Sequence, residues 1–136
     1  MAFDAGMLAA VAAELREKLT GARVTKVQQP EKDEIDLVMH IDRENLRLLI
    51  SASPSAPRIH LSTEQKENPI TAPMFCMLLR KHLGGARLCE IEQPGFERVL
   101  RLVFDTVDEM GFPVRRSLIC EIMGKYSNII FCGDGD

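Results

Sequence analysis

The stretch EQPGFERVLRLVF, residues 92–104, shows most plainly how this chain folds. A turn-forming Pro-Gly pair leads into a run of alternating character, which is typical of a β-strand. Successive side chains of a strand point to opposite faces, so Arg98 shares the more apolar face with Leu100, Leu102 and Phe104. An unpaired buried guanidinium is too costly, so Arg98 must lie at the rim of that face or pair with a carboxylate.

The rest of the chain predicts an α+β fold with two helices and about eight antiparallel strands. Residues 5–19 have apolar side chains at helical spacing, with Asp4 at the N-cap position and Gly21 beyond the end. A second helix is expected between Thr71, as its cap, and Gly84, with a buried stripe of Met74, Phe75, Leu78, Leu79 and His82 or Leu83. The eight expected strands are 22–30, 35–41, 46–52, 58–62, 86–93, 98–104, 115–123 and 127–132. Short connections and the absence of strand–helix alternation favour antiparallel pairing.

Length and composition indicate one globular domain. The chain has 136 residues, of which 46% are hydrophobic and 27% charged, and its net charge is −3. That charge argues against binding nucleic acid through bulk charge alone, although it leaves room for a local basic surface. The start lacks the basic region of a signal peptide and carries Asp4, Glu14, Arg16 and Glu17, and no apolar run is long enough to span a membrane. We therefore expect a cytoplasmic protein, and the abrupt end after a strand suggests that residues 1–136 are one domain of a longer protein.

Motifs for catalysis, metal binding or a cofactor are missing from the sequence. The three histidines are dispersed, none beside a plausible nucleophile, and no phosphate-binding loop or metal-binding motif occurs. The four cysteines show no C-x-x-C spacing and are expected to be buried, reduced thiols: they are Cys76, Cys89, Cys120 and Cys132. We expect a protein that is not an enzyme.

Basic side chains offer a better-supported function, polar recognition of phosphates and sugars. They fall at the end of the second helix and on or between the later strands: Arg80, Lys81, His82, Arg87, Arg98, Arg101, Arg115, Arg116 and Lys125. Nearby carboxylates offer the simpler interpretation, that most are solvated surface charges. Glu121, in an otherwise apolar strand, also needs a partner, and an ion pair with Arg98 would satisfy both residues.

Six strings in the sequence together resemble the NFACT-N domain, the amino-terminal domain of the RqcH family, whose members are also labelled fibronectin-binding protein A. The strings are MAFDAGML, QQPEKDEI, SASPSAPRIHL, ENPITAPMFCMLLRKHLGG, IEQPGFER and EIMGKYSNII. The resemblance implies a fold like the N-terminal domain of the formamidopyrimidine-DNA glycosylases, in which the strands form an antiparallel β-sandwich flanked by helices. It implies no glycosylase activity, because the amino-terminal proline nucleophile of those enzymes is absent.

The resemblance also implies partners and a site. The family binds the large ribosomal subunit that carries a stalled peptidyl-tRNA and recruits alanyl-tRNA, so that a carboxy-terminal tail is added without mRNA. An Asp-Arg pair needed for tailing falls on Glu97 and Arg98, and a further aspartate falls on Asp4, whose spacing alone indicates only a helix cap. Glutamate at position 97 extends the carboxylate by about 1.5 Å, one bond length. A surface adhesin that binds fibronectin is the alternative function.

Overall fold

Eight antiparallel strands form one continuous sheet in the order β4-β3-β2-β1-β5-β6-β7-β8. The computed structural model describes residues 5–122 and 127–133. The helices are α1 (Ala5–Leu19) and α2 (Met74–Leu83), with a short 3-10 turn, η1 (Pro94–Phe96). The strands are β1 (Arg23–Glu31), β2 (Glu34–Ile41), β3 (Glu44–Ser51), β4 (Arg58–Ser62), β5 (Arg87–Glu92), β6 (Val99–Val107), β7 (Pro113–Glu121) and β8 (Asn128–Cys132).

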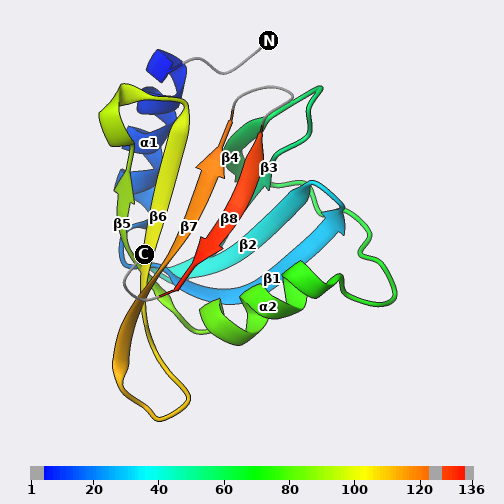
Figure 1. Cartoon of the computed structure of the whole chain (residues 1–136), viewed down its shortest axis with the longest axis vertical. Coiled ribbons are helices and arrows are strands. Elements are labelled where there is room, and N and C mark those ends of the chain that lie inside the picture. The colour runs from blue at the N-terminus through cyan, green and yellow to red at the C-terminus, as the bar shows by residue number, and fades with distance from the viewer. Residues whose placement is uncertain (1–4, 123–126, 134–136) are drawn as a thin grey trace.

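The sheet bends where its two four-stranded halves join. Strands β1 and β5 are paired only through Arg23 and Arg87, whereas the other neighbours pair along most of their length. Figure 1 shows β1 and β2 crossing the direction of β6, β7 and β8, with α1 beside β5 and α2 beside β1. Two halves of one bent sheet therefore take the place of the expected two-sheet sandwich. The α+β class, the antiparallel pairing and the two helices are confirmed, and the likeness to the glycosylase domain stays a prediction.

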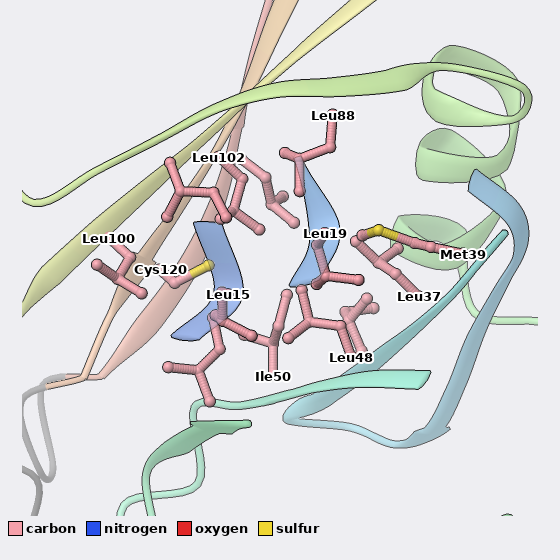
Figure 2. Packing of buried hydrophobic residues seen from close by; sticks show 14 of the residues in the cluster. Leu15, Leu19, Leu37, Met39, Leu48, Ile50, Leu88, Leu100, Leu102 and Cys120 are labelled. Carbon is pink, nitrogen blue, oxygen red and sulfur yellow. The ribbon is translucent and has the colours of Figure 1, made fainter. Parts of the chain in front are cut away.

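Both halves of the sheet contribute to one hydrophobic core. Leu15 and Leu19 of α1 lie among Leu37 and Leu48 from one half and Leu102 from the other, and all five are fully buried (Figure 2). A fully buried leucine side chain contributes about 1.5–3 kcal/mol through the hydrophobic effect. Leu8 and Ala12, nearer the start of α1, are also fully buried, so the helix is part of the core along most of its length.

The second helix buries only part of the expected stripe: Leu79 and Leu83 are buried as predicted and Phe75 is partly buried against the core. Cys76 is buried as well, whereas Met74 is 84% and Leu78 40% exposed. The run MFCMLL is apolar at every position, so its periodicity does not define which face is buried. The helix also begins later than expected, because Pro73 is its N-cap and no side chain caps it, so Thr71 does not fill that role.

Strand β1 runs past Pro30 to Glu31, one residue beyond the expected end. The pairing with β2 shifts register between Gln28 and Glu31. Proline has no N–H to donate to a sheet ladder, and an irregular pairing accommodates it there.

Candidate functional site: the turn before strand β6

Residues 93–98 form a tight turn that leads from β5 into β6. Pro94 fixes one backbone angle at the start of η1, and Gly95 adopts a left-handed conformation with φ of 57°. The Glu97 N–H then donates to the Pro94 carbonyl at 3.2 Å. The turn depends on Gly95, because residues with a Cβ are strained in this region.

Hydrogen bonds hold the backbone of both predicted site residues. The Gln93 side-chain amide donates to the Glu97 carbonyl at 2.6 Å. The carbonyl of Arg98 accepts a hydrogen bond from the N–H of Ile122, just beyond β7, at 2.9 Å. The backbone of Glu97 and Arg98 is therefore fixed on two sides, from the turn and from the neighbouring strand.

The side chains of Glu97 and Arg98 are both exposed. Within residues 5–122 and 127–133, neither side chain forms a hydrogen bond or an ion pair. On the strand that follows, Leu100 and Leu102 are fully buried, as the alternation predicts. Arg98 thus lies at the rim of the apolar face, one of the two positions that the sequence allowed.

The ion pair between Arg98 and Glu121 is not formed, and the strand register explains why. Glu121 lies opposite Val99, so the hydrogen bond from Ile122 places Ile122 opposite Arg98. Directly opposite residues of an antiparallel pair share a face, and neighbours along a strand do not. Arg98 and Glu121 therefore point to opposite faces of the sheet.

Other arginines of β6 and β7 have carboxylate partners or are half-buried. Arg115 pairs with Asp105 at 3.1 Å and with Glu90 at 3.6 Å. Arg101 lies 3.9 Å from a carboxylate oxygen of Glu92. Arg116 is half-buried, and its Nε atom has no hydrogen-bond partner in the described part of the chain. These side chains are balanced or partly covered by the fold, whereas Arg98 is exposed and has no carboxylate partner among the described residues.

The basic residues at the end of α2 have structural partners as well. Arg80 donates from Nε to the Val27 carbonyl at 2.9 Å, which ties α2 to β1. The His82 ring stacks on Phe131, with ring centroids 5.3 Å apart, and burial lowers the pKa of His82. Lys81 pairs with Glu109 at 3.4 Å. Lys125 lies outside the described residues.

A cavity of about 400 Å³ lies away from the 93–98 turn, between the end of α2 and the loop that joins β6 to β7. It is lined by Lys81, His82, Val107, Asp108, Glu109, Met110 and Arg116. The lining contains two basic and two acidic side chains, Lys81 and Arg116 with Asp108 and Glu109, so its charge favours neither an anion nor a cation. We therefore place the candidate site at the turn and not in this cavity.

Asp4, the third predicted site residue, lies outside the described residues, but the next residue, Ala5, is described. Its carbonyl accepts a hydrogen bond of 2.9 Å from the same Gln93 amide nitrogen that binds the Glu97 carbonyl. The structure thus brings the first residue of α1 next to the turn. Sequence analysis missed Gln93, for which the only signal was its place at the head of the Pro-Gly turn.

The cysteines are all free. Cys76 and Cys120 are buried, whereas Cys89 and Cys132 are half-buried. The prediction of buried thiols is therefore confirmed for two of the four cysteines. Burial raises the pKa of the Cys120 thiol to about 12 and also raises those of Cys76 and Cys89. These three thiols are therefore protonated and weakly nucleophilic at neutral pH.

The described residues offer neither a metal site nor a membrane-spanning helix. Across 5–122 and 127–133, no three or more His, Cys, Asp or Glu side chains are placed to hold a metal ion. None of the described helices has the length and apolar character needed to cross a membrane.

The family model for the NFACT N-terminal and middle domains matches residues 4–136. The chain is 42% identical over 130 residues to the Rqc2 homolog RqcH of Bacillus subtilis, covering 96% of this chain and 23% of that protein. Identity to the archaeal Rqc2 homolog aRqcH of Methanocaldococcus jannaschii is 32%, covering 88% of this chain and 17% of that protein. The chain thus spans about a quarter or less of the length of these relatives.

Solved structures of similar proteins have the same fold. The N-terminal domain of the fibronectin-binding protein PavA from Streptococcus pneumoniae superimposes with a TM-score of 0.95 at 37% identity, covering 98% of this chain and 51% of that one. The N-terminal part of the fibronectin/fibrinogen-binding protein from Streptococcus suis gives a TM-score of 0.95 at 39% identity, covering 98% and 50%. The fibrinogen-binding protein from Staphylococcus aureus gives 0.88 at 36% identity, covering 98% and 47%.

Proposed function

Because this chain belongs to the NFACT N-terminal and middle domain family, we propose that it is the tRNA- and ribosome-facing domain of a ribosome quality control factor. The factor recruits alanyl-tRNA to a large ribosomal subunit that carries a stalled peptidyl-tRNA, and the nascent chain is extended at its carboxy terminus without mRNA. The ribosome supplies the chemistry of peptide-bond formation. The chain itself therefore acts in the cytoplasm as a binding protein, with no catalytic residue, cofactor or metal.

The observation that carries this proposal is the state of Arg98. Its backbone is held by Ile122 just beyond β7, its side chain is exposed, and no carboxylate of the described residues neutralises it. A guanidinium in this state is available for two parallel hydrogen bonds to a phosphate, which is the contact that arginine makes best. Arg98 is therefore proposed to bind the tRNA backbone.

Glu97 has a separate role in the proposal, as an acceptor for a ribose hydroxyl or as a group that orients Arg98. Its side chain lies over Gly95, with Cγ and Oε1 both 3.8 Å from where a Cβ of that glycine would be. The carboxylate accordingly stays close to the turn despite its additional methylene group. Asp4 is proposed to complete the site from the start of α1, because the adjacent Ala5 lies next to the turn.

Equilibrium binding of tRNA tests the proposed role of Arg98. We expect Arg98→Ala to lose about 1.5–3 kcal/mol of binding free energy, the value of a hydrogen-bonded charge, and thus about tenfold or more in Kd. The log–log salt dependence of binding should become shallower by about 0.7–0.9, the contribution of one phosphate contact. Arg115→Ala is the matched control, since Arg115 already pairs with Asp105 and Glu90 and its loss should change Kd little. Equal Kd values for the natural chain and Arg98→Ala would disprove the assignment.

Tailing by the full-length protein on obstructed large subunits tests the larger part of the proposal. Arg98→Ala and Glu97→Ala are each expected to reduce the length and yield of alanine tails. Replacing alanyl-tRNA by another aminoacyl-tRNA in the same assay tests which tRNA is recruited. Normal tailing by both variants would remove the site from the proposal.

A fibronectin-binding adhesin is the second candidate function, because the solved relatives from Streptococcus are named for fibronectin binding. Cell fractionation distinguishes the two functions. Salt-sensitive co-sedimentation with ribosomes supports the first, since contacts to phosphates weaken as salt increases. Recovery with the cell surface, together with saturable binding of purified fibronectin, would support the second.

A further inference from the structure

Gln93 joins two segments that lie far apart in the sequence. Its Nε2 atom donates to the carbonyl of Ala5, at the start of α1, at 2.9 Å and to the carbonyl of Glu97 at 2.6 Å. A glutamine amide nitrogen carries two N–H groups, and these two acceptors use both of them. One side chain thus fixes the start of α1 and the turn before β6 in a single geometry.

This arrangement places Gln93 behind the proposed binding site. The two carbonyls that it binds belong to Glu97 itself and to the residue that follows Asp4. The next carbonyl along the chain, that of Arg98, is held separately by Ile122. Gln93 therefore fixes the Glu97 carbonyl, and with it the peptide group that leads into Arg98, relative to the start of α1, while Ile122 fixes the other side of Arg98.

Alternative residue types at position 93 lack this capacity. A glutamate has the same shape, but its ionised carboxylate has no N–H and faces two carbonyl oxygens. A methionine has similar length and no strong donor. An asparagine is one methylene shorter and cannot keep both hydrogen bonds without movement of the backbone.

We propose that Gln93 is a positioning residue for RNA binding, which holds the start of α1 and the Glu97–Arg98 turn in the arrangement that contacts the tRNA. The inference rests on the proposed function of Arg98 and extends it to a residue that does not itself contact the RNA. Loss of the two hydrogen bonds lets the turn and the start of α1 move independently, so the contacts of Arg98 and Glu97 weaken although both side chains remain.

The chain offers a matched control for the general attachment of α1. Arg16, further along the same helix, donates from Nε to the carbonyl of Ile91 on β5 at 2.7 Å. Arg16→Met removes a side-chain hydrogen bond between the same helix and the end of β5, together with one positive charge, without touching the turn. A purely structural role of Gln93 predicts that Gln93→Met and Arg16→Met behave alike.

The test measures tRNA Kd and melting temperature for Gln93→Met, Gln93→Glu and Arg16→Met, each with and without Arg98→Ala. We expect both Gln93 variants to weaken tRNA binding about three- to tenfold, and Arg16→Met to leave Kd within about twofold. In the Arg98→Ala background the Gln93 effect should become smaller, because the part that acts through Arg98 is lost and only the part that acts through Glu97 remains. Gln93→Glu keeps the side-chain shape, so it provides the answer if Gln93→Met does not fold.

Three results would overturn the inference: unchanged Kd in both Gln93 variants, an equal loss in Arg16→Met, or an undiminished Gln93 effect in the Arg98→Ala background. Either of the last two results would mean that Gln93 contributes to the general stability of the fold and not specifically to RNA binding. If Arg98→Ala alone binds tRNA normally, the proposed function itself fails and the role of Gln93 fails with it. If Arg98→Ala weakens binding and the Gln93 variants do not, only the positioning role is lost.

Discussion

Lys66 is expected to stabilise the fold through a buried carboxylate, although it lies in the segment between β4 and α2. Its Nζ atom contacts Glu34 Oε1 at 2.7 Å and Glu31 Oε2 at 3.0 Å. The Glu34 side chain is only 3% exposed, whereas that of Glu31 is 65% exposed. The exposed pair contributes little, so the effect of Lys66 comes mainly from its contact with Glu34.

Glu34 lies beside a second buried acid. Asp36, two residues further on and on the same face of β2, is 1% exposed and pairs with Arg47 at 3.0 Å. Burial, and then the neighbouring Asp36, raises the pKa of Glu34, while Lys66 opposes this change. Removing Lys66 leaves Glu34 buried beside a carboxylate with no cation of its own. Loss of one partner of a buried ion pair costs about 3–5 kcal/mol. We expect Lys66→Met to lower the free energy of unfolding by about 3 kcal/mol at neutral pH. This is the lower end of the range, because Glu34 can bind a proton when Lys66 is absent.

The pH dependence provides a sharper test than the magnitude. The pKa of Glu34 is higher in the folded state than in the unfolded state, so this group favours folding below its unfolded pKa and loses that contribution as pH rises through the folded value. Without Lys66 the folded pKa rises further. The destabilisation by Lys66→Met should thus be largest near neutral pH and shrink towards pH 4.

Urea unfolding of the natural chain and Lys66→Met at pH 4.5 and pH 7.5 measures both effects. Lys18→Met is the control, because Lys18 pairs with Glu14 at 3.5 Å on the exposed face of α1 and should contribute no more than about 0.5 kcal/mol at either pH. A loss below about 1 kcal/mol at pH 7.5, or the same loss at both pH values, would refute the argument from burial.

Three further predictions concern the turn and α2. Gly95→Ala should destabilise the fold by about 1–2 kcal/mol, because φ is 57° there, and should also weaken tRNA binding; denaturant unfolding beside a binding titration measures both. Glu97→Asp should preserve tailing whereas Glu97→Gln should reduce it, if the charge and not the length of the side chain is what the site requires. Leu79→Ala should cost about 2–5 kcal/mol in urea unfolding, whereas Met74→Ala should stay within about 0.5 kcal/mol, since Leu79 is fully buried and Met74 84% exposed.

Prediction from the sequence succeeded where a local pattern determines the structure. Alternation gave the strands, and the rim position of Arg98 followed from the cost of burying an unpaired charge. The burial of strand β2 was harder to predict than its position, because Glu34 and Asp36 are buried on the face that alternation assigns to solvent. Their burial depends on Lys66 and Arg47, cations from other segments, and a single strand gives no sign of such partners.

The candidate site was only partly predictable for a related reason. The resemblance located Glu97 and Arg98, and the turn chemistry indicated why the chain bends before them. The role of Gln93 depends on a carbonyl 88 residues away in the sequence, and no local periodicity encodes that contact. The same limit applies to the pairing of Arg98 with Glu121, which only the register of β6 against β7 could exclude.

The charge distribution bears on the proposed binding of RNA by an acidic chain. With a net charge of −3, the molecule as a whole repels a polyanion. Any attraction must therefore come from basic side chains that are not paired with a carboxylate. On β6 and β7 the fold neutralises Arg101 and Arg115 with nearby acids. At Arg98 the strand register directs Glu121 to the other face, and the side chain is left exposed. A single exposed cation orients the bound RNA more than it increases the affinity. Each phosphate contact releases only about one counterion, so one such contact contributes little to the total binding free energy. The geometry of the turn, and hence the hydrogen bonds of Gln93, should therefore matter more to the proposed function than the total number of basic residues.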